Sequence, residues 1–433
     1  MARITTDDVH DYINGVCFKT GPPGKVGVET EWLVTDPAQP TAGVSLDRLS
    51  GALDTTTALP GGSRVTFEPG GQLELSSPAL PGPARAHEAL AADLDHAAKN
   101  LAEAGLRLSG AALDPVRPPR RQLRSPRYAA MERFFTNHRQ PSGRTMMCST
   151  ASVQVCLDTG ADTADLRARW ELAHRLGPPL VAAFANSAHW RGRPTGWKST
   201  RWVIWAATDA SRTRPVLDGV HRPDPATAWA EYALAARVMA IPQTPDGDGR
   251  WTADPGFTFA EWVDGRGPRA ATLDDLEFHL STLFPPVRPR GWWELRMIDA
   301  LPHRWWPVPM ALAAALLDDP VARSTAEEAT ERLCGPGVPD PRLWLRSAQR
   351  GMADPAVAEC AIACFDAAVR ALPRMGAAHL ASLLDDYADR YTRRGLSPAD
   401  DGPRIPGPRD AGTGASRTGP DPTHHSEPSG GAR

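Results

Sequence analysis

The sequence lacks the features that mark several large classes of protein. Its 433 residues include only six cysteines, too few for a disulfide scaffold, which favours a reducing cytoplasm. No run of about 18 apolar residues is present, so we expect no membrane-spanning helix. The opening residues, MARITTDDVHDYING, contain no apolar segment typical of a secretion signal.

The chain also has no excess of charge of one sign. Its 48 lysines and arginines are balanced by 51 aspartates and glutamates, giving a net charge of −3. No overall basic field is available to attract nucleic acid or an anionic membrane, and we expect neither as a partner. Neither glycine-rich phosphate loop, GxGxxG after a strand or GxxxxGK[ST], occurs. A nucleotide site, if present, must be built differently.

The length allows two or three domains, or one large enzyme domain. We expect a single catalytic domain over residues 1–396, with a helical part from about residue 300. Residues 397–433 contain seven prolines and seven glycines but few apolar residues, and we expect this tail to be disordered. The sequence leaves the oligomeric state open.

Hydrophobic periodicity predicts strands and helices intermixed early in the chain. Alternation predicts strands over residues 24–36, 149–158 and 291–298, and two short strands around a Pro-Gly-Gly turn within 63–78. Helical spacing covers residues 84–104, 163–176, 226–240, 307–318, 323–333, 342–350 and 355–394. Short alternating strands favour an antiparallel sheet with one wet face, so we expect an α+β fold.

Acidic and amide side chains recur on the predicted strands, each flanked by apolar residues. They are Glu29, Glu31, Glu68, Glu74, Gln154 and Glu294, and Arg296 shares a strand face with Glu294. If they converge, each pair of carboxylates about 4 Å apart repels by roughly 4 kcal/mol. Mg²⁺ or Mn²⁺ would relieve this repulsion, and Mg²⁺ usually shares its ligands with substrate phosphates. The pattern therefore indicates phosphoryl chemistry, although a solvated sheet face with outward carboxylates fits the same spacing.

Longer strings of the sequence carry a family resemblance. They are GVETEW, RVTFEPGGQLELSSPAL, MMCSTASVQVCLD, LVAAFANSAHWRGRPTGWKSTRWVIWAATDASRT, EYAL and FHLSTLFPPVRPRGWWELRMIDALP, in this order. Together they resemble the glutamate–cysteine ligase family of the plant and proteobacterial type. The resemblance runs from about residue 10 to 395 and is greatest to the actinobacterial branch that makes γ-glutamylcysteine for ergothioneine.

The resemblance implies a glutamine-synthetase-like fold, in which a curved antiparallel sheet forms a funnel with helices packed outside. It implies that ATP and Mg²⁺, with Mn²⁺ possible, activate L-glutamate as a γ-glutamyl phosphate, which the amine of L-cysteine then attacks. The family's metal ligands correspond to Glu29, Glu31, Glu68, Glu74, Gln154 and Glu294, and Arg296 would face the transferring phosphoryl group.

The glutamate pocket is less well matched. Arg212, in DASRT, resembles the arginine that binds the α-carboxylate of glutamate, but a structural loop arginine fits as well. The plant enzymes carry a second arginine where this chain has Ser149, so Ser149 and Thr150 would hydrogen-bond the substrate instead.

Two other functions stay open at this point. One is a carboxylate–amine ligase that uses another amine in place of cysteine. The other is a non-catalytic protein of the same fold that binds nucleotide or amino acid and regulates a partner. The residues that would bind adenine are not identified by any pattern.

Overall fold

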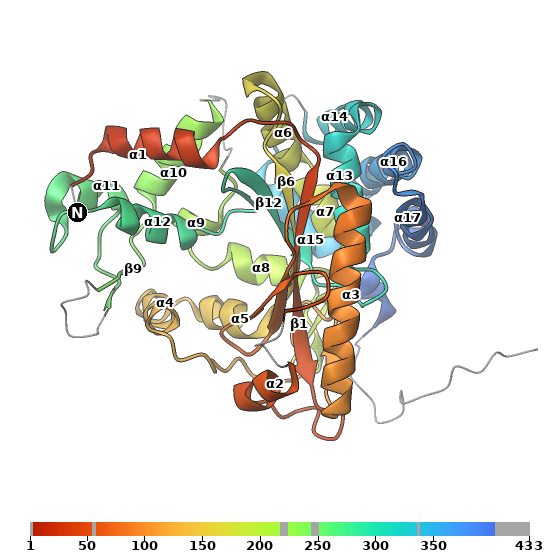
Figure 1. Ribbon diagram of the computed structural model, residues 1–433, viewed down its shortest axis with the longest axis horizontal. Coiled ribbons are helices and arrows are strands. Elements are labelled where there is room, and N and C mark those ends of the chain that lie inside the picture. Colours follow the sequence, from red (N-terminus) through yellow and green to blue (C-terminus); the bar gives the residue numbers. More distant parts are fainter. Residues whose placement is uncertain (1–2, 54–57, 217–223, 244–250, 336–337, 403–433) are drawn as a thin grey trace, which may run out of the picture.

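The centre of the molecule is an antiparallel β-sheet flanked by helices (Figure 1). The structure is a computed structural model and describes residues 3–53, 58–216, 224–243, 251–335 and 338–402. Within these residues the main sheet contains β1 Lys25–Thr35, β2 Arg64–Phe67, β3 Leu73–Ser76, β4 Leu80–Pro81, β5 Arg107–Ser109, β6 Ser152–Asp158, β11 Val287–Pro289 and β12 Trp292–Asp299. The strand order is β11-β12-β6-β1-β3-β2, and β4 and β5 pair with the two ends of β1.

The alternation predicted for β1 is confirmed. Val28, Thr30 and Trp32 are buried on one face, while Glu29 and Glu31 are partly exposed on the other. The neighbouring strands continue this division, because Leu73 and Leu75 of β3 and Val153 and Val155 of β6 are also buried. One face of the sheet is therefore apolar core, and the opposite face carries the polar side chains.

Two pairs of short strands lie outside the main sheet. They are β7 His189–Trp190 with β8 Arg193–Pro194, and β9 Ala240–Ile241 with β10 Thr252–Ala253. The helices before residue 300 are α1 Thr6–Tyr12, α2 Leu46–Leu53, α3 Gly82–Glu103, α4 Pro126–Asn137, α5 Pro141–Ser149, α6 Thr163–Arg175, α7 Gly177–Ala183, α8 Thr200–Ala206, α9 Ala210–Thr213, α10 Pro225–Ala235, α11 Phe259–Glu261 and α12 Leu273–Ser281. Those after residue 300 are α13 Pro307–Asp318, α14 Pro320–Cys334, α15 Pro341–Arg350, α16 Pro355–Ala371 and α17 Ala378–Arg390.

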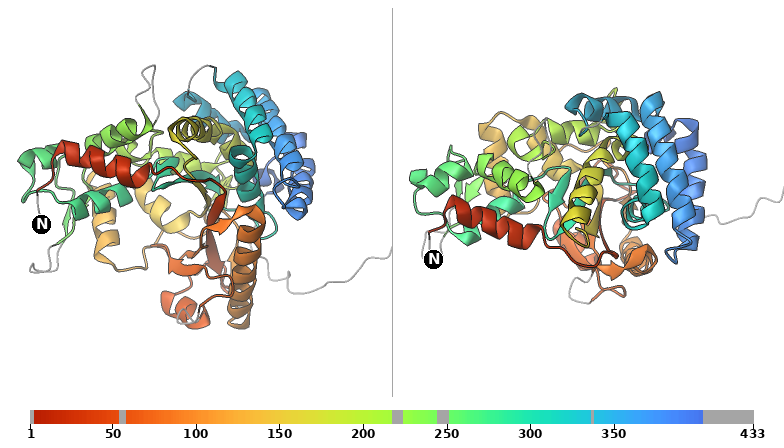
Figure 2. Two further views of the ribbon diagram at one scale, coloured as in Figure 1. Left: turned by 45° about the horizontal axis from the view of Figure 1, so that its top comes forward. Right: turned by 90° about the horizontal axis from the view of Figure 1, so that it is seen from above.

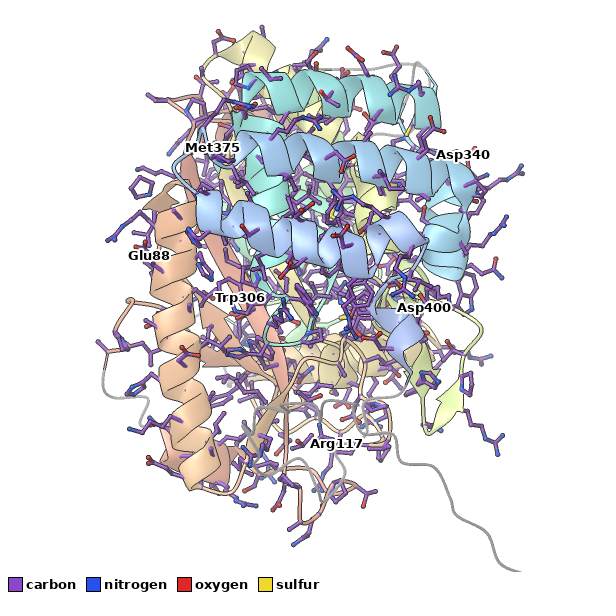
Figure 3. The ribbon with its side chains drawn as sticks, turned by 90° about the vertical axis from the view of Figure 1, so that its right-hand side faces the viewer. Glu88, Arg117, Trp306, Asp340, Met375 and Asp400 are labelled. Carbon is purple, nitrogen blue, oxygen red and sulfur yellow. The ribbon has the colours of Figure 1, made fainter. Side chains whose placement is uncertain are left out.

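The helices cover the two faces of the sheet unequally. Helix α3 runs beside β1, and the helices from α13 onward form a layer on the same side (Figures 1 and 2). Figure 3 looks onto this layer, in which α14, α16 and α17 lie side by side. Helices α4, α5 and α8 lie on the other side of the sheet. The expected α+β class, with an antiparallel sheet, outer helices and a helical C-terminal third, is confirmed.

Many of the prolines begin helices rather than break them. Helices α10, α14, α15 and α16 each start with an Asp-Pro pair in which the aspartate caps the helix. In α14, for example, Asp319 accepts hydrogen bonds from the backbone N–H groups of Val321 and Ala322. Proline fits the first helical turn because the backbone N–H groups of that turn have no acceptor within the helix, so the N–H that proline lacks is not needed there.

Two boundaries differ from the expectations. The helical pattern over residues 355–394 is divided between α16 and α17, with Pro373 and a left-handed Gly376 (φ 71°) in the connection. Residues 397–402, which the sequence predicts to be part of the tail, pack onto the domain. There Ala399 N–H donates to Ala185 O at 2.9 Å, and Asp400, labelled in Figure 3, pairs with Lys198 at 2.5 Å. The rest of that predicted tail, residues 403–433, lies outside the described residues.

In the described part of the chain, no helix has both the length and the apolar character needed to cross a membrane.

We predict that Leu75→Ala lowers the free energy of unfolding by about 2–5 kcal/mol, because it leaves a cavity in the apolar face of the sheet. The Leu75 side chain is 0% exposed, whereas that of Leu345 is 42% exposed. Leu345→Ala is the matched control and should change the same free energy by less than about 0.5 kcal/mol. Urea denaturation of both variants measures the difference, and equal losses would contradict this account of the core.

Candidate active site

Three carboxylates meet on the polar face of the sheet. Glu31 and Glu74 lie directly opposite each other on β1 and β3, and Glu68 follows β2. One oxygen from each of the three lies within 4.8 Å of the others. The strand pairing therefore confirms that these side chains converge, which the sequence pattern alone left open.

The Pro-Gly-Gly turn predicted between the strands places Glu68. Glu68 N–H donates to Gln72 O, and Gly71 N–H donates to Glu68 O, each at 2.8 Å. Gly71 has a φ of 89°, which favours glycine. A Cβ at Gly70 would lie 2.2 Å from the carbonyl oxygen of Cys148, so only glycine allows this close approach. The two glycines thus let the turn fold back and direct Glu68 toward its partners.

A cavity of about 350 Å³ lies over these carboxylates. Its polar wall includes Glu29, Glu31, Glu68, Glu74, Gln154, Thr150 and Arg296, all of which are predicted site residues. Its remaining polar residues include Arg64, Arg127, Tyr128, Arg288 and Arg290, and an apolar wall contains Met131, Met146, Met147, Trp205 and Phe284. The cavity therefore joins anionic, cationic and apolar surfaces in one space.

Glu294 has a different environment from the other carboxylates. It is 1% exposed and is not among the residues that line the cavity. Arg288 donates to its two oxygens at 2.5 and 3.0 Å, and Arg296 donates to one of them at 2.9 Å. Burial alone would raise the pKa of Glu294, but Arg288 and Arg296 outweigh burial and hold its pKa at about 2. Here Glu294 anchors two arginines.

Gln154 links the two halves of the site. It lies opposite Glu29 on the neighbouring strand, and its Nε2 donates to Glu31 at 2.9 Å. Its Oε1 accepts a hydrogen bond from Nη1 of Arg296. The amide therefore connects the converging carboxylates to the arginine that the family resemblance assigns to the phosphoryl group.

Glu29, Glu31 and Glu68 have pKa values above that of an ordinary carboxyl group. Burial, Glu294 and Glu74 together raise the pKa of Glu29 to about 7. Burial, together with Glu74, raises the pKa of Glu31. Burial, together with Glu31 and Glu74, raises the pKa of Glu68 well above its usual value. These carboxylates cannot all ionise side by side, and a hard divalent cation is the partner that such an oxygen donor set fits.

The residues expected to bind glutamate are placed less favourably. Arg212 is completely buried, and its three guanidinium nitrogens donate to Asp209, to Thr282 and to the carbonyl oxygen of Arg237. It does not line the cavity, and its contact with substrate stays a prediction. Ser149 is buried outside the cavity lining, and the Thr150 hydroxyl donates to Met146 O at 2.6 Å.

Sequence reasoning missed several residues of this cavity. Arg288 and Arg290 alternate in VRPRGWWELR, immediately before the predicted strand that carries Glu294, and this spacing could have placed them on the same face. The residues contributed by α4, α5 and α8 have no comparable signal. These helices are brought onto the polar face of the sheet by tertiary packing, which local sequence patterns do not specify.

Residues 25–413 match the family described as glutamate–cysteine ligase family 2. The chain belongs to this family. It is 41% identical over 402 residues to the glutamate–cysteine ligase EgtA of Mycolicibacterium smegmatis, covering 90% of this chain and 92% of that one. It is 40% identical over 395 residues to EgtA of Mycobacterium tuberculosis, covering 90% and 88%. The family expected from the sequence motifs is thus confirmed.

More distant relatives also carry the family name. The chloroplastic glutamate–cysteine ligase of Brassica juncea is 29% identical over 277 residues, which cover 62% of this chain and 52% of that one. Among solved structures, a glutamate–cysteine ligase from Francisella tularensis in complex with AMP aligns with a TM-score of 0.48 and 11% identity, covering 89% of this chain and 85% of that one.

We predict that the metal-free protein loses stability as the pH rises from about 4.5 to about 7. Burial and neighbouring carboxylates raise the pKa of Glu29 to about 7 in the folded state, against an ordinary value of 4.5. Between these values only the folded state keeps the proton, so raising the pH removes a stabilising proton. Mg²⁺ or Mn²⁺ should abolish the decline by binding the ionised carboxylates.

Urea denaturation in EDTA and in Mg²⁺, across this pH range, measures the effect. Glu68→Gln should reduce the decline in EDTA, because the pKa of Glu68 is itself raised well above its usual value and the substitution removes the contribution of Glu68. Glu88→Gln, at an exposed position on α3, is the control and should leave the decline intact. A stability that stays constant in EDTA for the unmodified protein would contradict the electrostatic account.

Proposed function

We propose that the protein is an ATP-dependent glutamate–cysteine ligase that joins the γ-carboxylate of L-glutamate to the amine of L-cysteine. The observation that carries this proposal is the convergence of Glu31, Glu68 and Glu74 in one cavity beside Arg296. Phosphoryl transfer demands positioned cations more than it demands a nucleophile from the protein, and this cavity offers both a cation site and guanidinium groups.

In the proposed reaction a γ-carboxylate oxygen of glutamate attacks the γ-phosphorus of ATP, and ADP leaves. Arg296 is suited to hold the transferring group, because it lines the cavity and carries a planar cationic group that matches phosphate oxygens. Its Nη1 is already fixed by Gln154 and Glu294. A guanidinium group that the protein holds in this way is positioned before the substrate binds.

Glu31, Glu68 and Glu74 would hold a divalent cation, for which we propose Mg²⁺ or Mn²⁺, with Glu29 and Gln154 as neighbouring oxygen ligands. When bound, the cation neutralises phosphate charge and orients the phosphoryl oxygens. We propose that Glu294 contributes by fixing Arg288 and Arg296, and that it becomes a cation ligand only if these arginines turn to the phosphates.

The second step is attack of an amine on the acyl carbon of γ-glutamyl phosphate, with release of inorganic phosphate. The wall formed by Met131, Met146, Met147 and Phe284 is apolar and polarisable, which suits a small thiol side chain. Cysteine is therefore the proposed amine, and another amine is the alternative. The proposed setting is the cytoplasm, and the proposed use of the product is ergothioneine synthesis.

Phosphate release, measured with ATP, Mg²⁺ and glutamate across a panel of amines, tests the function. We expect release to depend on glutamate and cysteine, and mass spectrometry to detect γ-glutamylcysteine. Release with a different amine alone would keep the ligase chemistry and replace the substrate. No release with any amine would contradict a catalytic role and favour a binding protein of the same fold.

We predict that Glu74→Gln and Arg296→Ala each lower kcat at least about 100-fold, because each removes a group that stabilises charge at the reacting phosphorus. Circular dichroism should show that both variants stay folded. Glu88→Gln and Arg85→Ala alter an exposed ion pair on α3 and are the matched controls, with unchanged turnover. Normal activity of a folded Arg296→Ala variant would remove that residue from the mechanism.

A further inference from the structure

Arg296 lies at an irregularity in its strand. The pairing of β12 with β6 shifts register between Leu295 and Ile298, which is the pattern of a β-bulge. The backbone N–H of Arg296 donates to Pro286 O at 2.8 Å, beyond the start of β11. A bulge bends the strand and redirects the side chain that it carries. The direction of the Arg296 guanidinium therefore depends on whatever holds this bulge in place.

A second arginine contacts the backbone of the bulge. Arg201, on α8, is only 2% exposed and does not line the cavity. Its Nη2 donates to the carbonyl oxygen of Arg296 at 3.0 Å. The backbone group held by this hydrogen bond belongs to the residue whose side chain lines the cavity.

Arg201 is itself held rigidly. Asp299, farther along β12, lies 3.7 Å from its Nη1. Asp299 in turn accepts hydrogen bonds from the hydroxyls of Ser187 and Ser199 at 2.7 and 3.0 Å and from Asn186 N–H at 2.9 Å. The carboxylate of this buried pair therefore has its own set of donors, and Arg201 has little freedom to move.

Arg201 and Arg296 also contact the same aromatic ring, that of Trp205, which lines the cavity. The guanidinium carbons of Arg201 and Arg296 lie 5.4 and 5.6 Å from the centre of the Trp205 ring. The indole Nε1–H donates to Phe284 O at 2.9 Å, which fixes the ring. Trp205 thus gives both cations a favourable aromatic neighbour.

A buried cation of this kind contributes little to stability by itself. The cost of removing a guanidinium from water commonly equals or exceeds the gain from its ion pair. The Nε–H of Arg201 moreover has no partner among the described residues. A stabilising role therefore explains a buried arginine at position 201 poorly. Its hydrogen bond to the bulge at Arg296 explains it directly.

We propose that Arg201 is a positioning residue for the ligase reaction, which fixes the β12 bulge through the Arg296 carbonyl and so directs the Arg296 guanidinium into the cavity. This inference rests on the proposed function. Arg201 touches no reacting atom in this scheme, and its whole effect passes through Arg296.

Steady-state kinetics of Arg201→Gln test the proposal. We expect kcat to fall about 10- to 100-fold, the loss typical of a catalytic group displaced by about 1 Å, with KM for ATP and glutamate within about twofold of the parent. Arg201→Gln/Asp299→Asn removes both buried charges, so that no charge is left unpaired if the single variant fails to fold, and should show the same loss of kcat.

The matched control is Arg169→Gln. Arg169 is also 2% exposed and pairs with Asp318 at 2.8 Å, but it lies on α6 and does not line the cavity. Its loss should lower the melting temperature without changing kcat. This control separates a general effect of removing a buried arginine from an effect on the reaction.

A double-mutant cycle decides whether the effect passes through Arg296. In an Arg296→Lys background, Arg201→Gln should lower kcat by less than a further twofold, because the group that it positions is already gone. Independent losses that multiply would overturn the proposal, as would an unchanged kcat in a folded Arg201 variant. If the unmodified protein shows no ligase turnover, the proposed function fails, and the Arg201 proposal fails with it. This outcome differs from the two above, in which the unmodified protein is active.

Discussion

Mutual repulsion among carboxylates on one face of the central sheet is the constraint on which the rest of the site depends. Strand pairing places Glu31 opposite Glu74, and the turn after β2 directs Glu68 to them, so that one oxygen from each lies within 4.8 Å of the others. Burial strengthens the repulsion, because little water remains to screen it. Two features of the fold limit this repulsion. Two arginines neutralise Glu294, and the other three carboxylates lie together where a divalent cation fits.

The arrangement is possible because the opposite face of the same strands supplies the stability. Val28 and Trp32 of β1 and Leu75 of β3 are buried on the side covered by α3 and the C-terminal helices (Figure 1). This apolar layer can compensate for an electrostatically unfavourable polar face only because side chains alternate along a strand. Stability and chemistry thus occupy opposite faces of one sheet, and neither needs a separate domain.

Arginine serves several distinct purposes in this chain. Arg288 is bound to Glu294, Arg212 is enclosed by protein groups, and Arg296 lines the cavity. Arg201 donates to the carbonyl oxygen of Arg296 and so holds its backbone. These roles follow from the number of donors that each guanidinium has left after its protein partners are satisfied. Composition and local sequence do not distinguish these roles.

Local sequence patterns were enough to predict which residues share a strand face, where the Pro-Gly-Gly turn lies, and to which family the chain belongs. These features are local, since alternation and turn chemistry act within a few residues, and the family strings are read directly. Three other features became visible in the folded chain. Glu31 lies opposite Glu74, Arg288 forms hydrogen bonds with Glu294, and residues of α4, α5 and α8 line the cavity. These outcomes depend on strand register and on contacts between segments far apart in the chain, which no local pattern specifies.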